Sequence, residues 1–125
     1  MRLLLDTHVL LWWFNEPEVL SQQAVAAIAE ETNAVYVSAV TIWEAGIKQA
    51  LGKLRGADDL VSRVREQRLD ELPVELEHAA AAARLPSHHN DPFDRILVAQ
   101  AQAEGLTVVT RDVRLGAYGV ALLAA

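Results

Sequence analysis

Four acidic residues occupy positions where a folded protein seldom keeps a charge without compensation. Asp6 directly follows an apolar run, and Asp112 comes two residues after another. Glu44 and Asp94 lie in stretches where apolar residues recur at helical spacing. A carboxylate on a buried face is costly unless it is paired, protonated or bound to a metal ion. These positions indicate a site in which acids bind a cation.

Glu44 belongs to a helix predicted from Ser38 to Leu51, with Ser38 as its cap and Gly52 at its end. At about 100° per residue, Glu44 falls inside the apolar stripe of this helix, formed by Val40, Trp43, Ile47 and Leu51. The alternative is an ion pair between Glu44 and Lys48 at the i,i+4 spacing. This stretch alone favours neither interpretation.

Asp94 repeats the pattern in a helix predicted to begin at Asp91 and Pro92. It shares a helical face with Leu97, Val98 and Ala101. Asp91 is expected to cap the helix, and an acid three residues later also fits an ordinary helix start.

Asp6 and Asp112 have a simpler explanation too, because acids commonly open turns after strands. Two acids at strand ends and two on apolar helix faces nevertheless form a stronger pattern than any one of them. If the four meet, their combined charge requires a cation. Oxygen ligands suit Mg²⁺ or Mn²⁺, ions that hold phosphate and activate water for phosphodiester hydrolysis.

The composition is that of an ordinary globular protein, and we expect residues 1–125 to form a single domain. The absence of cysteine excludes thiolate catalysis and disulfides, and it fits a cytoplasmic location. The apolar start is broken at Asp6, too early for a signal-peptide core or a membrane span, so we expect no membrane association.

The net charge of −6 counts against non-specific nucleic-acid binding by the whole chain. One segment is nevertheless rich in basic residues, and these would be either solvated helix faces or a strip that binds phosphates. They are Lys48, Lys53, Arg55, Arg63, Arg65 and Arg68.

Strands and helices alternate along the chain, which predicts an α/β protein with a three-layer α/β/α fold. Its central sheet would be mostly parallel and have four to five strands. The predicted extended segments are 1–5, 35–37, 69–72, 107–110 and 120–123. The predicted helices are 10–14, 21–31, 38–51, 58–68, 75–84 and 91–104. Because sites in such sheets lie outside the carboxyl ends of the strands, Asp6 and Asp112 should share one rim.

Four blocks of the sequence, in this order, resemble PIN-domain ribonucleases, and in particular the toxins of bacterial VapBC toxin–antitoxin systems. The blocks are LLLDTHVLLWW, VSAVTIWEAGIKQALGKL, LPSHHNDPFDRILVAQA and LTVVTRD. The resemblance covers nearly the whole chain. It implies a PIN-like fold, RNA as substrate, an antitoxin protein that blocks the site, and a homodimer. It also implies a catalytic metal site formed by Asp6, Glu44, Asp94 and Asp112.

The resemblance places further residues around these acids. Thr110 matches a hydroxyl position that would orient a ligand or a water molecule. Contacts to substrate or to the acids are expected from Thr7, Asp91, Arg95, Arg111 and, with the basic segment, Lys48.

The histidines and tryptophans receive other roles. His88 and His89 are expected in a polar loop near the cleft, His8 packed or capping near the first strand, and His78 on a helix surface. Core or interface positions are expected for Trp12, Trp13 and Trp43.

Three alternatives compete with a ribonuclease. A receiver-like signalling domain would accept a phosphoryl group on Asp6, although it would want a lysine after a late strand, where only Arg111 and Arg114 occur. A non-catalytic binding module would keep the fold only as a partner surface. A structure-specific DNA nuclease would use the same acids, because no residue visibly reads a 2′-hydroxyl.

Overall fold

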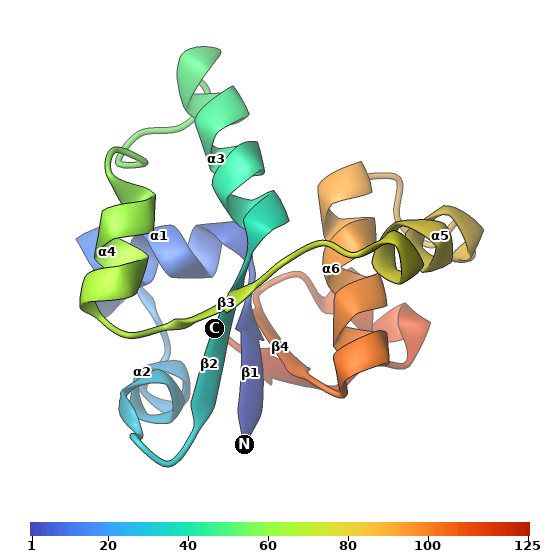
Figure 1. Ribbon diagram of the computed structural model, residues 1–125. Helices are drawn as coiled ribbons and strands as arrows, with labels where there is room; N and C mark the ends of the chain where they lie inside the picture. The colour runs from blue at the N-terminus through green and yellow to red at the C-terminus, as the bar shows by residue number, and fades with distance from the viewer.

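A computed structural model describes residues 1–125 and has a sheet of five strands in the order β3-β2-β1-β4-β5 (Figure 1). The strands are β1 (Arg2–Leu5), β2 (Ala34–Ser38), β3 (Asp70–Leu72), β4 (Thr107–Thr110) and β5 (Leu122–Ala124). The helices are α1 (Thr7–Asn15), α2 (Gln22–Ala29), α3 (Ala39–Ala50), α4 (Leu60–Glu66), α5 (Leu76–Arg84) and α6 (Pro92–Glu104). Two short 3-10 helices are η1 (Pro17–Val19) and η2 (Val113–Tyr118).

The fold class predicted from the sequence is confirmed. All four strand pairings are parallel, so the sheet is wholly rather than mostly parallel. The central strand β1 is apolar and fully buried at Leu3, Leu4 and Leu5, as a strand covered on both faces should be. Leu3 and Leu5 pack into one core cluster, whereas Leu4 packs into another on the opposite face.

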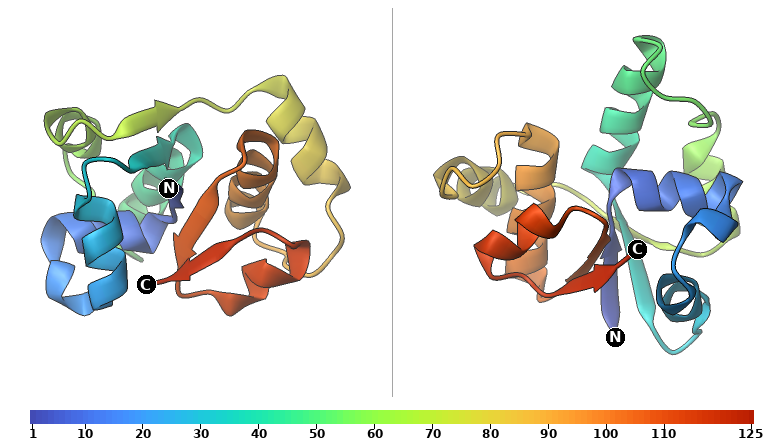
Figure 2. Two further views of the ribbon diagram at one scale, coloured as in Figure 1. Left: turned by 90° about the horizontal axis from the view of Figure 1, so that it is seen from below. Right: turned by 180° about the vertical axis from the view of Figure 1, so that it is seen from behind.

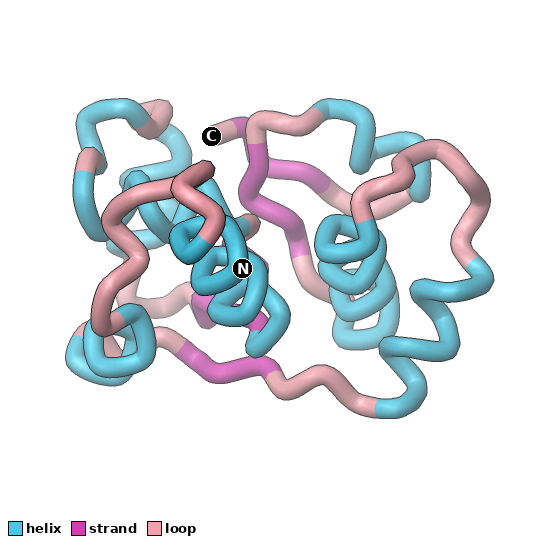
Figure 3. Tube along the Cα trace, turned by 90° about the horizontal axis from the view of Figure 1, so that it is seen from above, coloured by secondary structure: helices cyan, strands magenta, loops and turns pink.

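Helices cover both faces of the sheet, which gives the three predicted layers (Figures 1 and 2). Residues of α1, α2 and α4 share the core cluster of Leu3 and Leu5, and residues of α6 and η2 share that of Leu4. The α5 helix packs against α6, and α3 contacts both α1 and α6. The view in Figure 3 looks onto the carboxyl ends of the strands, where α3 and α6 rise on either side. None of the helices is both long and apolar enough to span a membrane.

Side-chain caps fix where the helices begin. Ser21, Ser38 and Asp91 each accept a hydrogen bond from a backbone N–H in the first turn of the next helix, as predicted. The first helix, however, begins at Thr7 rather than near Leu10. The reason is that Asp6 also acts as a cap and accepts from the N–H of Val9 at 2.9 Å.

The prediction for His78 is wrong, because this residue is buried rather than on a helix surface, with 2% of its area exposed. Its Nδ1 atom accepts from the N–H of Glu75 at 3.0 Å, which caps α5. Its Nε2 atom lies 3.1 Å from a carboxylate oxygen of Glu104 in α6. His78 therefore joins α5 to α6, the helix that carries Asp94.

We predict that His78→Ala lowers the free energy of unfolding by about 1–3 kcal/mol, because a buried acceptor and a buried donor would both be lost. Chemical denaturation of the purified protein measures this change. The matched control is His8→Ala, which removes an exposed ring and should cost no more than about 0.5 kcal/mol. Equal stability of the two variants would contradict a structural role for His78.

Candidate active site at the carboxyl end of the sheet

Asp6 lies at the carboxyl end of β1, and its two carboxylate oxygens have different partners. Oδ1 accepts from the N–H of Val9, and Oδ2 accepts from the hydroxyl of Thr110 at the end of β4. Burial raises the pKa of Asp6, while the hydrogen bond from Thr110 acts in the opposite direction. The predicted location of Thr110 beside the acids agrees with this contact.

Asp112 is positioned from the same strand end. Its backbone N–H donates to the hydroxyl of Thr110 at 3.0 Å, so one threonine links Asp6 and Asp112. The guanidinium of Arg114 donates to both carboxylate oxygens of Asp112, at 2.9 and 2.8 Å. These hydrogen bonds hold the pKa of Asp112 well below its usual range.

Glu44 projects from α3 into the protein, with only 4% of its area exposed. It accepts from the hydroxyl of Thr7 at 2.5 Å and forms an ion pair with Lys48. The predicted i,i+4 pair is therefore present, but it does not exclude a role at the site. The hydrogen bond to Glu44 raises the pKa of Lys48, and the charges of Asp91 and Asp94 add to this effect.

Asp94 lies in the first turn of α6, and its backbone N–H donates to the capping carboxylate of Asp91 at 3.2 Å. Burial, followed by the negative charges of Asp91, Glu44 and Asp6, raises the pKa of Asp94 to about 7, while His89 acts in the opposite direction. The two helix acids and the acid of β1 are therefore near enough to repel one another. The structure brings together residues that the sequence separates by up to about ninety positions.

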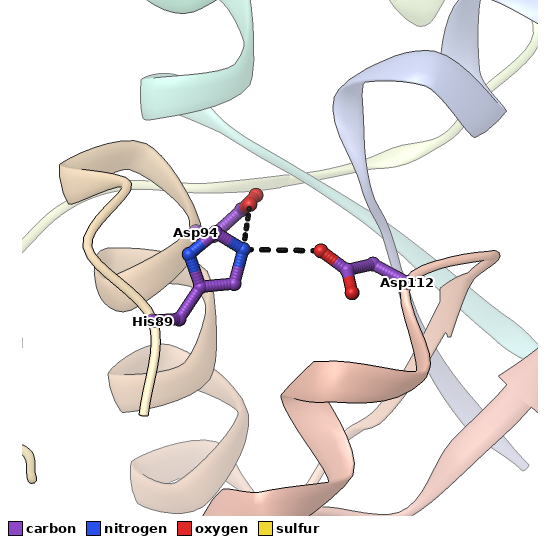
Figure 4. A group of neighbouring side chains, drawn as sticks. All are labelled: His89, Asp94 and Asp112. Atoms are coloured by element: carbon purple, nitrogen blue, oxygen red, sulfur yellow. Dashed lines mark hydrogen bonds and ion pairs between the residues drawn. The ribbon is translucent and has the colours of Figure 1, made fainter. Parts of the chain in front are cut away.

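His89 lies in a loop near the acids, as expected, but the sequence interpretation did not predict its contacts to two of them. Its Nε2 atom lies 3.1 Å from Asp94 Oδ2 and 3.0 Å from Asp112 Oδ2 (Figure 4). Ligand atoms of these three residues lie within 4.8 Å of one another, and Asp6 and Glu44 are not part of this compact group. The only signal in the sequence was the position of His89 two residues before Asp91.

Two predicted contacts need correction, because both arginines are occupied by backbone carbonyls. Arg95 donates to the carbonyls of four residues at the end of α5 and in the loop before α6: Ala82, Leu85, Pro86 and His89. Arg111 donates to the carbonyls of Val19 and Ala125, and its guanidinium lies 4.2 Å from the ring centre of Trp12. Both arginines hold the scaffold around the acids, in place of the expected contacts to phosphate.

The basic segment divides into paired and unpaired residues. Arg63 donates to the carbonyl of Phe14 and to Asn15, and Arg65 pairs with Glu71. No hydrogen bond or ion pair involves the side chains that remain: Lys53, Arg55 and Arg68. These three side chains are without a protein partner, whereas Lys48, which pairs with Glu44, keeps part of its surface exposed.

Among the tryptophans, Trp12 and Trp13 pack against the core, as expected. Trp43 does not, because 63% of its area is exposed. It contacts the edge of Phe93, with the ring centres 5.4 Å apart. Since Trp43 precedes Glu44 and Phe93 precedes Asp94, this aromatic pair borders the site.

We use the name acid cluster for Asp6, Glu44, Asp94 and Asp112. Its donors are carboxylate oxygens, which suit a hard divalent cation such as Mg²⁺ or Mn²⁺. The raised pKa of Asp94 means that the neighbouring side chains do not fully compensate the negative charge of its carboxylate. The residues present therefore fit a divalent ion.

The PIN domain family model matches residues 3–120. The chain belongs to the PIN domain family. It is 34% identical over 123 residues to ribonuclease VapC22 from Mycobacterium tuberculosis, an alignment that covers 92% of this chain and 90% of that protein.

Solved structures of similar fold extend over nearly all of this PIN domain. FitAcB from Neisseria gonorrhoeae is 26% identical, with a TM-score of 0.67, and the match covers 97% of this chain and 96% of that one. VapBC2 from Rickettsia felis, bound to a DNA fragment from its promoter, is 16% identical, with a TM-score of 0.73 and coverage of 99% and 98%. At that identity, the second likeness concerns the fold alone.

We predict that the metal-free protein loses stability as the pH rises from about 4 to about 7. The pKa of Asp94 is about 7 in the folded protein and 3.8 for an unperturbed aspartate, as in the unfolded chain, so the folded state binds this proton more tightly across that interval. The loss should be on the order of 2 kcal/mol, since partial exposure of Asp94 screens its charge.

Thermal unfolding in the presence of a chelator, at a series of pH values, measures this dependence. In Asp94→Asn the dependence should become smaller, and the residual part would come from Asp6, whose pKa is also raised. Stability that rises over the same interval in the parent protein would contradict the assignment of a buried, poorly compensated carboxyl to Asp94.

Proposed function

We propose that this chain is a metal-dependent ribonuclease that hydrolyses phosphodiester bonds of RNA. The observation that carries the proposal is the meeting of a buried acid of α3 with two half-buried acids, one after β1 and one in α6, at one rim, where Glu44 and Asp6 raise the pKa of Asp94. The 34% identity to a ribonuclease over most of both chains supports the same activity.

The acid cluster would hold Mg²⁺ or Mn²⁺. When bound, such an ion neutralises charge on the scissile phosphate and activates water for attack. The chain itself supplies the orientation: Thr110 holds one oxygen of Asp6, and Thr7 holds one oxygen of Glu44. One carboxylate of the cluster would accept the proton that the attacking water loses.

We propose that Lys48 contacts the phosphate backbone of the substrate close to the acid cluster. The charges of Glu44, Asp91 and Asp94 keep it protonated, and it is partly exposed. Lys53 and Arg55, which follow the helix of Lys48, would extend this contact along the strand of RNA, whereas Arg68 lies with Asn33 and Asp70 at the opposite end of the sheet.

We also propose a protein partner that covers the site, namely an antitoxin. The sequence blocks around the acids resemble VapBC toxins, and the fold is that of VapBC2. A homodimer, which the resemblance implies, and a cytoplasmic location, which fits the absence of cysteine, belong to the same proposal.

The alternatives have less support. A receiver-like domain would want a lysine after a late strand, whereas Arg111 follows β4 here and donates to backbone carbonyls instead. A DNA nuclease would use the same acids, but the relative with 34% identity is a ribonuclease.

We predict that Asp6→Asn and Asp94→Asn each reduce RNA cleavage at least about 100-fold, the scale of one catalytic group. Asparagine at position 6 keeps an oxygen that accepts from Val9, so the fold should be retained. Cleavage of a labelled single-stranded RNA with Mg²⁺ or Mn²⁺ measures the activity, and a chelator should abolish it.

The matched control is Glu77→Gln, which neutralises an exposed acid of α5 and should cut RNA at the parent rate. A DNA strand of the same sequence, tested in parallel, separates the two nuclease activities. A folded Asp6→Asn protein that cuts RNA as fast as the parent would rule out this site.

A further inference from the structure

The ring of His89 spans two members of the acid cluster that come from different elements. Asp94 lies in α6 and Asp112 caps η2, and one nitrogen atom of His89 lies 3.1 and 3.0 Å from their carboxylate oxygens (Figure 4). Only 8% of the His89 side chain is exposed, so water competes little for these contacts. A polar loop near the cleft, the place expected for this histidine, agrees with its position but does not by itself explain these two contacts.

The hydrogen bond at the other ring nitrogen, Nδ1, determines whether Nε2 of His89 faces the acids as a donor or as an acceptor. The backbone N–H of Asp91 donates to Nδ1 of His89 at 3.1 Å. In a neutral imidazole one nitrogen accepts and the other carries the hydrogen. Because Nδ1 accepts, Nε2 carries the hydrogen; it donates to Asp112 Oδ2 at 3.0 Å and lies 3.1 Å from Asp94 Oδ2. Coordination of a metal ion by Nε2 would require this hydrogen to leave.

The backbone of His89 is fixed independently of its ring. Its N–H donates to the hydroxyl of Tyr118 at 2.8 Å, and its carbonyl accepts from Arg95 at 3.3 Å. The position of the imidazole is therefore set by η2 and α6 before any carboxylate is contacted. An alanine at position 89 would keep both backbone contacts.

Arg114 provides the contrast. It also donates to Asp112, but it is 67% exposed and does not reach Asp94 with a hydrogen bond. His89 is the residue that ties the carboxylate of α6 to the carboxylate that follows β4.

We propose that His89 is a positioning residue, whose Nε2–H holds the carboxylates of Asp94 and Asp112 toward a shared divalent ion without coordinating that ion itself. The inference rests on the proposed function for the role of the ion. Donors that orient metal-binding carboxylates typically change metal affinity about 10–100-fold when they are removed.

The test is the affinity of the full chain for Mn²⁺ and for Mg²⁺, measured separately by calorimetry. His89→Ala should weaken both affinities about 10–100-fold and leave their ratio unchanged, because no ligand is lost. His89→Gln, whose amide N–H can donate to the same carboxylates, should recover part of the affinity. The neighbouring exposed His88, which packs on Tyr118, gives the control His88→Ala, expected to bind as the parent does.

Two results would overturn the proposal. One is a folded His89→Ala protein that binds both ions as tightly as the parent. The other is a loss confined to Mn²⁺, because a nitrogen ligand favours that ion over Mg²⁺ and His89 would then coordinate it. RNA cleavage by the parent protein, assayed on the same preparation, tests the ribonuclease separately: ion binding that depends on His89 without RNA cleavage would reject only the proposed substrate.

Discussion

Several carboxylates lie close together in this protein where little water reaches them, and most of the other features of the site follow from that constraint. Burial and mutual repulsion raise the pKa of Asp94 to about 7, and burial raises the pKa of Asp6 as well. Such an arrangement is unfavourable unless neighbouring groups compensate the charge. The compensating donors come from the adjoining elements and are Thr7, Lys48, His89, Thr110 and Arg114.

The fold adds compensation through the backbone. Asp6, Ser38 and Asp91 cap α1, α3 and α6, so three helices begin at or near the rim where the acids meet. The N-terminus of a helix carries a partial positive charge, which favours nearby carboxylates. A parallel sheet contributes to this arrangement, because β1 and β2 end at the same edge and are followed there by α1 and α3. Asp6 is thus both a helix cap and a proposed ligand of the metal ion.

The features that the sequence predicted are those with local causes. The strands follow from short apolar runs, and the caps at Ser21, Ser38 and Asp91 follow from residue type and position alone. Asp6 shows where prediction from residue type ends. An acid after a strand can open a turn or cap a helix, and which of the two it does depends on the residues that follow. The proposed roles of the four acids stay a prediction, although repulsion among Asp6, Glu44 and Asp94 is evident in the pKa of Asp94.

The features that the sequence did not predict depend on contacts between distant segments. His78 and His89 have no periodic pattern that reveals their partners, which lie 26 and 23 residues further along the chain. From the sequence, Arg95 and Arg111 are expected to contact the substrate or the acids. In the structure both side chains donate hydrogen bonds to backbone carbonyls. Side-chain direction of this kind is set by packing, and charge alone does not encode it.

The hydrogen bonds from Arg95 to four backbone carbonyls have a thermodynamic consequence for the loop between α5 and α6. A segment with proline and two histidines would lose considerable conformational entropy if it became ordered only when a ligand arrives. Here one guanidinium restrains the loop during folding, at Ala82, Leu85, Pro86 and His89. Association of a ligand at this edge would therefore cost less conformational entropy in the loop than if the loop were unrestrained.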